Sequence, residues 1–116
     1  MLTAEDIRKF ALALPEAEEA PHFESTSFRV RKKIFATLKP ADWDGSFHVK
    51  LDPEDQHNLA AGHPGTIVPG DGYWGRKGWT RVHARSLSEA DLAGLLRTAW
   101  LTVAPKTLIK QVSAGA

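Results

Sequence analysis

The sequence predicts an α+β two-layer sandwich, in which a mostly antiparallel sheet packs on N-terminal and C-terminal helices. Two observations indicate this class. Apolar residues follow helical spacing most clearly near the two ends of the chain. Between these ends, short alternating runs follow one another without the crossover helices that a parallel sheet requires. We expect the helices to cover one face of the sheet and the other face to be open to water or to a partner.

The 116 residues correspond to a single domain over 1–116, with a core at about 3–108 and a frayed C-terminal tail. No apolar run reaches the roughly 18 residues that a membrane-spanning helix needs. The N-terminus carries acidic residues where a signal peptide would carry basic and then apolar ones. We therefore expect a cytoplasmic protein, with a monomer favoured.

The first predicted helix starts at a Thr3 cap, with Asp6 three residues on, and stops at Pro15. Its apolar face consists of Ile7, Phe10, Ala11 and Leu14. Residues 15–25 are expected to form a loop.

Strands are predicted at 26–30, 34–38 and 47–51. In the third strand, His48 and Lys50 would point outward. Arg31 and Lys32, between the first two strands, are not the residue types that tolerate positive φ, so we expect an irregular turn there.

A short helix is expected after Asp52, with Pro53 at its first position and Gly62 at its end. Residues 66–68 would form a short edge strand and 79–84 a further strand. Ser88 would cap the final helix, and Pro105 would break or kink it. The apolar stripe of that helix is Leu92, Leu95, Leu96, Ala99 and Val103.

The stretch 70–82, "GDGYWGRKGWTRV", formally contains G-x-G-x-x-G and nearly spells a phosphate-binding P-loop. Both motifs require a helix to follow the glycines, and a strand is predicted there instead. We expect a flexible loop before a strand. It would be either a turn whose tryptophans cover the edge of the core or a basic, aromatic-tipped wing.

Charge is distributed unevenly along the chain, although the net charge is only +1. Residues 1–20 hold five acidic and two basic side chains, whereas residues 21–85 hold ten basic and seven acidic ones. The predicted strands and turns carry most of these cations, which form either a solvated open face or a surface for a polyanion such as DNA. The candidate DNA-binding residues are Arg29, Arg31, Lys32, Lys33, Lys50, Trp74, Arg76, Lys77 and Arg81.

Other chemistry finds little support in the sequence. The chain has no cysteine, which excludes disulfides, thiol catalysis and cysteine-type zinc sites. Its five histidines all lie more than four residues apart, so no compact metal motif is formed, and no G-x-S-x-G nucleophile motif occurs. We expect no cofactor, no metal site and no enzymatic activity.

Three segments carry a resemblance to a known family. They are "LALPEAEEAPHFESTSFRVRKKIFATL" at 12–38, "HVKLDPED" at 48–55 and "YWGRKGWTRV" at 73–82, ahead of an amphipathic C-terminal helix. Together they resemble the MmcQ/YjbR family over about residues 3–108. The resemblance implies a fold similar to the frataxin/CyaY-like sandwich. It also implies DNA binding through two hairpin wings, here around Arg31–Lys33 and Gly75–Lys77.

Two positions depart from the family pattern. Arg31 and Lys32 replace small turn residues, and Ala99-Trp100 replaces a Ser-Tyr pair in the last helix, which removes a hydroxyl. The frataxin-like shape also raises iron binding, which needs an acidic ridge on the first helix and strand. The helix offers only Glu5 and Asp6, and the first predicted strands are basic.

The sequence therefore predicts a non-enzymatic DNA-binding module whose contacts are largely with phosphates. The alternative is a module that binds a protein or a small ligand on the open face and the Trp74/Trp79 segment. An enzyme of unspecified reaction is the third hypothesis.

Overall fold

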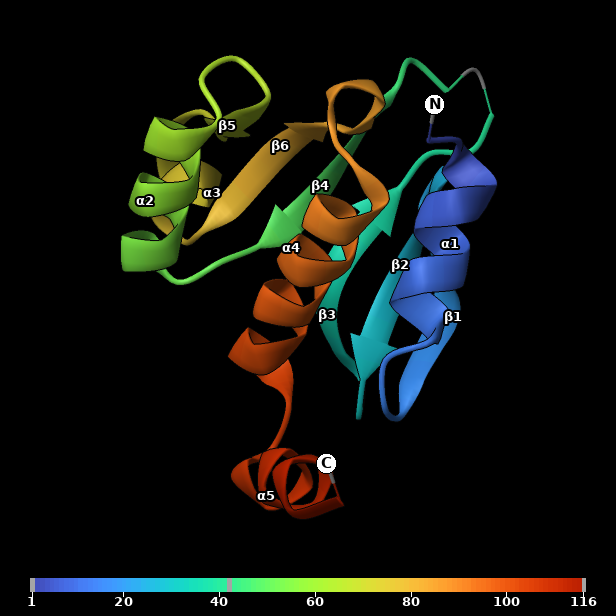
Figure 1. Ribbon diagram of the computed structural model, residues 1–116. Helices are drawn as coiled ribbons and strands as arrows, with labels where there is room; N and C mark the ends of the chain where they lie inside the picture. The colour runs from blue at the N-terminus through green and yellow to red at the C-terminus, as the bar shows by residue number, and fades with distance from the viewer. Residues whose placement is uncertain (1, 42, 116) are drawn as a thin grey trace.

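A computed structural model describes residues 2–41 and 43–115, and within them an antiparallel α+β fold (Figure 1). The six strands lie in the order β1-β2-β3-β4-β6-β5, and every pair is antiparallel. This confirms the predicted fold class. In chain order the elements are α1 (Ala4–Leu12), β1 (Ala17–His22), β2 (Ser25–Val30), β3 (Lys33–Leu38), β4 (Ser46–Lys50), α2 (Pro53–Gly62), β5 (Ile67–Pro69), α3 (Gly72–Arg76), β6 (Trp79–His83), the 3₁₀ turn η1 (Ala84–Ser86), α4 (Glu89–Val103) and α5 (Lys106–Gly115).

The helix starts follow the sequence signals. Thr3 and Asp6 form a reciprocal capping box at α1, and Ser88 accepts a hydrogen bond from the backbone N–H of Asp91 at α4. Asp52 occupies the N-cap position of α2, although its side chain makes no capping hydrogen bond. α5 extends to Gly115, where we expected a frayed tail, and Ala116 lies outside the described residues.

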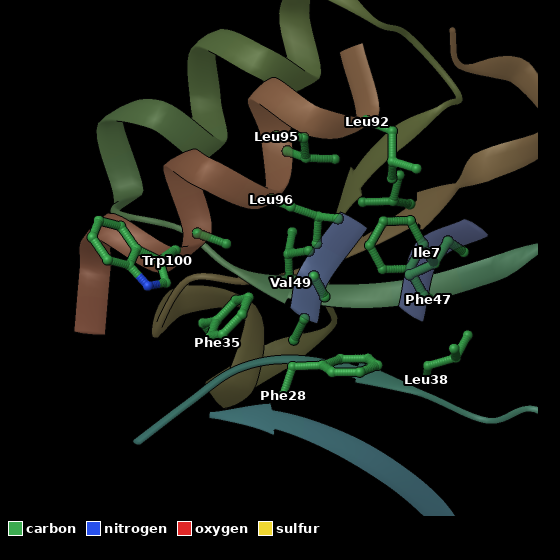
Figure 2. Close-up of a cluster of buried hydrophobic side chains, with 14 of the residues drawn as sticks. Ile7, Phe28, Phe35, Leu38, Phe47, Val49, Leu92, Leu95, Leu96 and Trp100 are labelled. Atoms are coloured by element: carbon green, nitrogen blue, oxygen red, sulfur yellow. The ribbon is translucent and has the colours of Figure 1, made fainter. Parts of the chain in front are cut away.

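The core lies between one face of the sheet and helices α1 and α4 (Figures 1 and 2). Ile7 of α1 lies in one buried cluster with the phenylalanines of the strands and with Leu92, Leu96 and Trp100 of α4. These side chains are almost fully buried, and each contributes about 1.5–3 kcal/mol through the hydrophobic effect. Trp100 also donates from Nε1 to the carbonyl oxygen of Pro15 at 2.9 Å. This bond ties α4 to the end of the first helical segment.

The predicted loop at 15–25 is wrong, because Ala17–His22 forms β1 at one edge of the sheet. The segment lacks the alternating large apolar residues that announce a half-buried strand. It contains Pro21, which cannot donate to a strand ladder, and an edge strand tolerates proline because one side has no partner. Pairing with β2, from Ala17 opposite Val30 to His22 opposite Ser25, makes this segment a strand.

The turn at Arg31 and Lys32 is a tight two-residue turn with positive φ at both positions, 49° and 72°. The hairpin therefore adopts the primed geometry without the residue types that favour it. The irregularity lies in the strands, where Phe28 pairs with Ala36 but Arg29 pairs with Ile34. Phe35 is thus an extra residue in β3, a β-bulge.

The bulge decides which side chains reach the core. Neighbouring residues of a regular strand point to opposite faces, yet Phe35 and Ala36 are both fully buried. Phe35 joins the cluster beneath α4 (Figure 2), and Ile34 is left on the open face.

Residues 70–78 contain the short helix α3, where a flexible loop was expected. The carbonyl oxygens of Gly75 and Trp79 and the hydroxyl of Thr80 all accept hydrogen bonds from Nε2 of the buried Gln56 side chain. The five-residue helix joins two antiparallel strands, so it is not the helix of a parallel dinucleotide-binding unit.

Within the two described ranges, no helix is both long and apolar enough to cross a bilayer.

We expect the substitution Gly75→Ala to destabilise the fold, because a Cβ at this position would overlap the carbonyl oxygen of Gly70. Overpacking of this kind costs about 1–3 kcal/mol of unfolding free energy. Urea denaturation followed by circular dichroism measures the effect. The control is Gly94→Ala in α4, where no atom lies near an added Cβ. That change should raise stability by up to about 1 kcal/mol, because alanine is the better helix former. Equal stability of Gly75→Ala and the parent chain would contradict the close packing of α3.

Candidate nucleic-acid interface on the open sheet face

The face of the sheet opposite α1 and α4 carries the candidate site. One row of paired residues crosses all six strands on this face: Ala20, Ser27, Thr37, His48, Arg81 and Val68. Two neighbouring pockets on this face share Thr37 and His48 in their linings. We call the two pockets together the open-face groove. One half of it is polar and the other is aromatic.

The polar half has a volume of about 390 Å³ and is lined mainly by hydroxyl and charged groups. Its lining residues are Ser25, Thr37, Lys39, Asp44, Ser46, Phe47, His48 and Arg81. Cations and an anion alternate around it, so it carries no strong net charge.

Asp44 is held in the wall of the polar half by its own loop. Its Oδ1 accepts hydrogen bonds from the backbone N–H of Ser46 at 2.9 Å and from the Ser46 hydroxyl at 2.6 Å. Its Oδ2 accepts from Nη2 of Arg81 at 3.0 Å. The Ser46 hydrogen bonds first, and the nearby Arg81 charge second, hold the pKa of Asp44 below its usual value. Asp44 is therefore a carboxylate at neutral pH.

The aromatic half has a volume of about 560 Å³ and lies between the sheet and α3. Ile34, Trp74 and Trp79 form its apolar walls, and the remaining lining residues are Thr37, His48, Gly70 and Asp71. The backbone N–H of Gly70 donates to the carbonyl oxygen of Trp79 at 2.9 Å, which holds the start of this segment against β6. The Trp74 side chain is 65% exposed and stands at the margin of the pocket.

Three of the nine predicted site residues already form side-chain ion pairs or hydrogen bonds within the protein. Arg31 forms a two-pronged pair with Glu16 at 3.1 and 3.2 Å, and Arg81 pairs with Asp44. Arg29 donates to the Ser27 hydroxyl at 2.7 Å and to the carbonyl oxygen of Pro21. A phosphate would have to compete with these partners.

The other six predicted residues lie at one end of the sheet. They are Lys32, Lys33, Lys50, Trp74, Arg76 and Lys77. Lys33 and Arg29 would share a face if the strand pairing were regular, but they do not. The bulge at Phe35 shifts the register, so Lys33 pairs with the core residue Val30 while Arg29 pairs with Ile34. Lys50 pairs with Trp79, which lines the groove, and therefore belongs to the open face as predicted.

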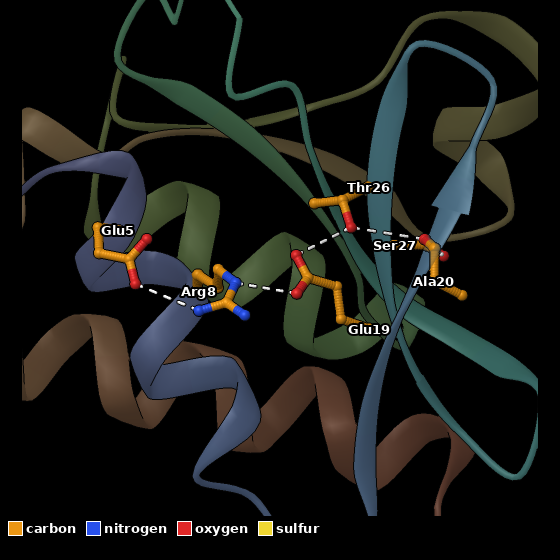
Figure 3. A network of polar contacts seen from close by, with 6 residues as sticks. All are labelled: Glu5, Arg8, Glu19, Ala20, Thr26 and Ser27. Atoms are coloured by element: carbon orange, nitrogen blue, oxygen red, sulfur yellow. Dashed lines mark hydrogen bonds and ion pairs between the residues drawn. The ribbon is translucent and has the colours of Figure 1, made fainter.

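β1, the strand that the sequence did not predict, is acidic because it carries Glu18 and Glu19. Glu19 accepts from Nε of Arg8 at 2.9 Å and from the Thr26 hydroxyl at 3.1 Å, and Arg8 also contacts Glu5 (Figure 3). This network joins α1 to the sheet. Among the described residues, no group of three or more acidic or histidine side chains is placed to hold a metal ion.

Sequence reasoning missed Ile34, Thr37, Asp44 and Asp71 as groove residues. Thr37 has the same outward alternation as Lys39, which was a usable signal. Ile34 gave no such signal, because its exposure depends on the bulge. Asp44 and Asp71 reach the groove from loops, and loop geometry is not readable from residue type.

His48 sits where the two halves of the groove meet. The pKa of His48 lies below 6.5, mainly because neighbouring atoms partly desolvate the imidazole. The positive charge of Arg81 lowers this pKa further, and the negative charge of Asp44 partly offsets the shift. The neutral imidazole is therefore favoured in the folded state.

We expect NMR titration to place the His48 midpoint below 6.5. As pH falls through 6.5, the unfolded chain binds this proton before the folded chain does, so the His48 contribution to stability is lost as pH decreases. Arg81→Ala should raise the midpoint, because it removes a neighbouring positive charge. His48→Gln should remove this part of the pH dependence from urea denaturation. A His48 midpoint above 6.5 in the parent chain would contradict the combined effect of partial desolvation and the Arg81 charge on the His48 pKa.

Comparison with known proteins agrees with this architecture. The chain is similar to the crystal structure of Deinococcus radiodurans protein DR2400, a DUF419-domain protein, with a TM-score of 0.76 and 29% sequence identity. The match covers 92% of this chain and 82% of that one. No curated protein matches the chain. The model of the YjbR family matches residues 12–102, and the chain therefore belongs to the YjbR family.

Proposed function

We propose that this YjbR-family protein is a non-enzymatic DNA-binding module. It would hold the phosphate backbone with cations at one end of its open sheet face. The observation that carries the proposal concerns Lys32, Lys50, Arg76 and Lys77. None of these four cations forms an ion pair with an acid of the described residues, whereas several other cations do. Unpaired exposed cations attract phosphates at the lowest desolvation cost.

Strand register supports the grouping of these four cations. Lys50 at the end of β4 pairs with Trp79 at the start of β6, and Arg76 and Lys77 directly precede Trp79. β4 runs antiparallel to β3, so its end lies toward the start of β3, which Lys32 precedes. The two segments proposed as wings therefore flank the aromatic half of the groove.

Exposed aromatic rings accompany the cations. Tyr73 is 57% exposed and Trp74 is 65% exposed. Nζ of Lys77 lies 5.3 Å from the centre of the Tyr73 ring. Flat rings beside cations suit a nucleic acid, in which bases or sugars alternate with phosphates.

The proposal is one of binding without catalysis. Within the described ranges, no serine or threonine hydroxyl is hydrogen-bonded to a histidine, the arrangement that activates many nucleophiles. Ser46 instead donates to Asp44.

A second candidate is a module that binds a protein or a small ligand. The aromatic half of the groove favours the small-ligand form, because its volume and apolar walls fit a small organic molecule.

We expect anisotropy of a labelled DNA duplex to show binding that weakens steeply with salt. If four cations neutralise phosphates, the slope of log affinity against log salt is about −3.6, or roughly a hundredfold loss between about 50 and 200 mM. Replacing Lys32, Lys50, Arg76 and Lys77 together with alanine should flatten this slope.

The matched control removes four cations from the helical side: Lys9, Arg97, Lys106 and Lys110. It changes the net charge equally, so it separates a local site from general attraction. Equal loss of binding in both variants, or no binding of the parent chain at about 50 mM salt, would contradict the proposed site.

A further inference from the structure

We infer that the aromatic half of the open-face groove holds one unpaired base, so that the preferred ligand is a single-stranded nucleic acid. This inference rests on the proposed function and adds the strandedness of the ligand. It depends on the shape and chemistry of the groove between Ile34, Trp74 and Trp79.

The walls of the pocket match the faces of a base. Trp74 and Trp79 come from α3 and β6 on one side, and Ile34 comes from β3. An aromatic ring that stacks on a base contributes about 1–3 kcal/mol to binding and accepts every base, since each has a flat apolar face. Trp74 is largely exposed, so a base would cover a ring that water now contacts.

The polar groups match the edge of a base rather than a phosphate. The Asp71 carboxylate lines the pocket and would repel a phosphate, but it would accept a hydrogen bond from a ring or exocyclic N–H group. Thr37 and His48 add a hydroxyl and an imidazole on the sheet side. The cations stand at the margin, with Lys50 opposite Trp79 and Lys77 beside Tyr73. This charge pattern places the base inside and the phosphates at the rim.

A duplex fits this surface less well. Its bases are already stacked on one another, and reading them requires an element that enters a groove of the helix. Among the described helices, only α3 contributes a side chain to the open-face groove, and it has five residues. A recessed pocket on a sheet suits bases that are turned out of a stack.

The test compares one labelled oligodeoxynucleotide of about twelve nucleotides, alone and annealed to its complement, by anisotropy at equal salt. We expect the single strand to bind at least about tenfold more tightly than the duplex. Trp74→Ala should weaken single-strand binding by roughly five- to a hundredfold, weaken duplex binding less, and leave the salt slope unchanged because no cation is removed. Trp74→Phe, which keeps a flat ring, should restore most of the affinity. Leu101→Ala, which truncates an exposed apolar residue of α4, is the control. It should alter neither single-strand binding nor duplex binding.

The outcomes separate this inference from the proposed function. Salt-dependent binding in which the duplex equals or exceeds the single strand, or in which Trp74→Ala has no effect, overturns the inference and leaves DNA binding standing. Absence of binding to both probes overturns both. In that case, quenching of tryptophan fluorescence by adenosine monophosphate, lost in Trp74→Ala, would assign the pocket to a small ligand instead.

Discussion

Simultaneous burial of Phe35 and Ala36 is the constraint on which the candidate site depends. A regular strand cannot send two neighbouring side chains into one core, and the bulge in β3 resolves this conflict. The core gains a phenylalanine beneath Trp100 (Figure 2). On the other side of the sheet, Ile34 becomes a wall of the groove and Lys33 leaves the face that Arg29 occupies. Packing on one face therefore sets the chemistry of the other.

The acidic first strand, β1, helps to determine which cations of the sheet are paired with acids. Sequence position separates the acids of the N-terminal segment from the basic middle, but pairing of β1 with β2 brings them together. Glu16 holds Arg31 at the hairpin turn, and Glu18 lies opposite Arg29. The exposed Arg31–Glu16 pair adds little stability, yet it neutralises a cation that could otherwise attract a polyanion. Lys50, Arg76 and Lys77 have no such partner among the described residues, and they lie farther along the sheet, around α3 and the start of β6. The distribution of unpaired cations over the open face therefore depends on the order of the strands.

The candidate site was predictable in part. Lys50 and His48 followed from outward alternation, and Trp74, Arg76 and Lys77 from their gathering in one glycine-rich stretch. That Trp74 and Trp79 face Ile34 across a pocket was not predictable, because β3 and β6 are not neighbours in sequence or in the sheet. The helical form of 72–76 escaped prediction because glycine is a weak helix former. Its conformation depends on the distant Gln56, whose side chain bonds the carbonyl oxygens of Gly75 and Trp79.

By itself, the sequence determined the antiparallel α+β class, helices α1 and α4 with their caps, the core strands and the family resemblance. These features depend on local periodicity, capping residues and the absence of crossover segments, all of which are contiguous in the chain. Only the tertiary structure decided that 17–22 is a strand, that the Arg31–Lys32 turn is tight and that β3 bulges. It also decided which cations are paired. Each of these depends on pairing or packing with another segment, whose free-energy contribution outweighs the weak local preference of the segment itself.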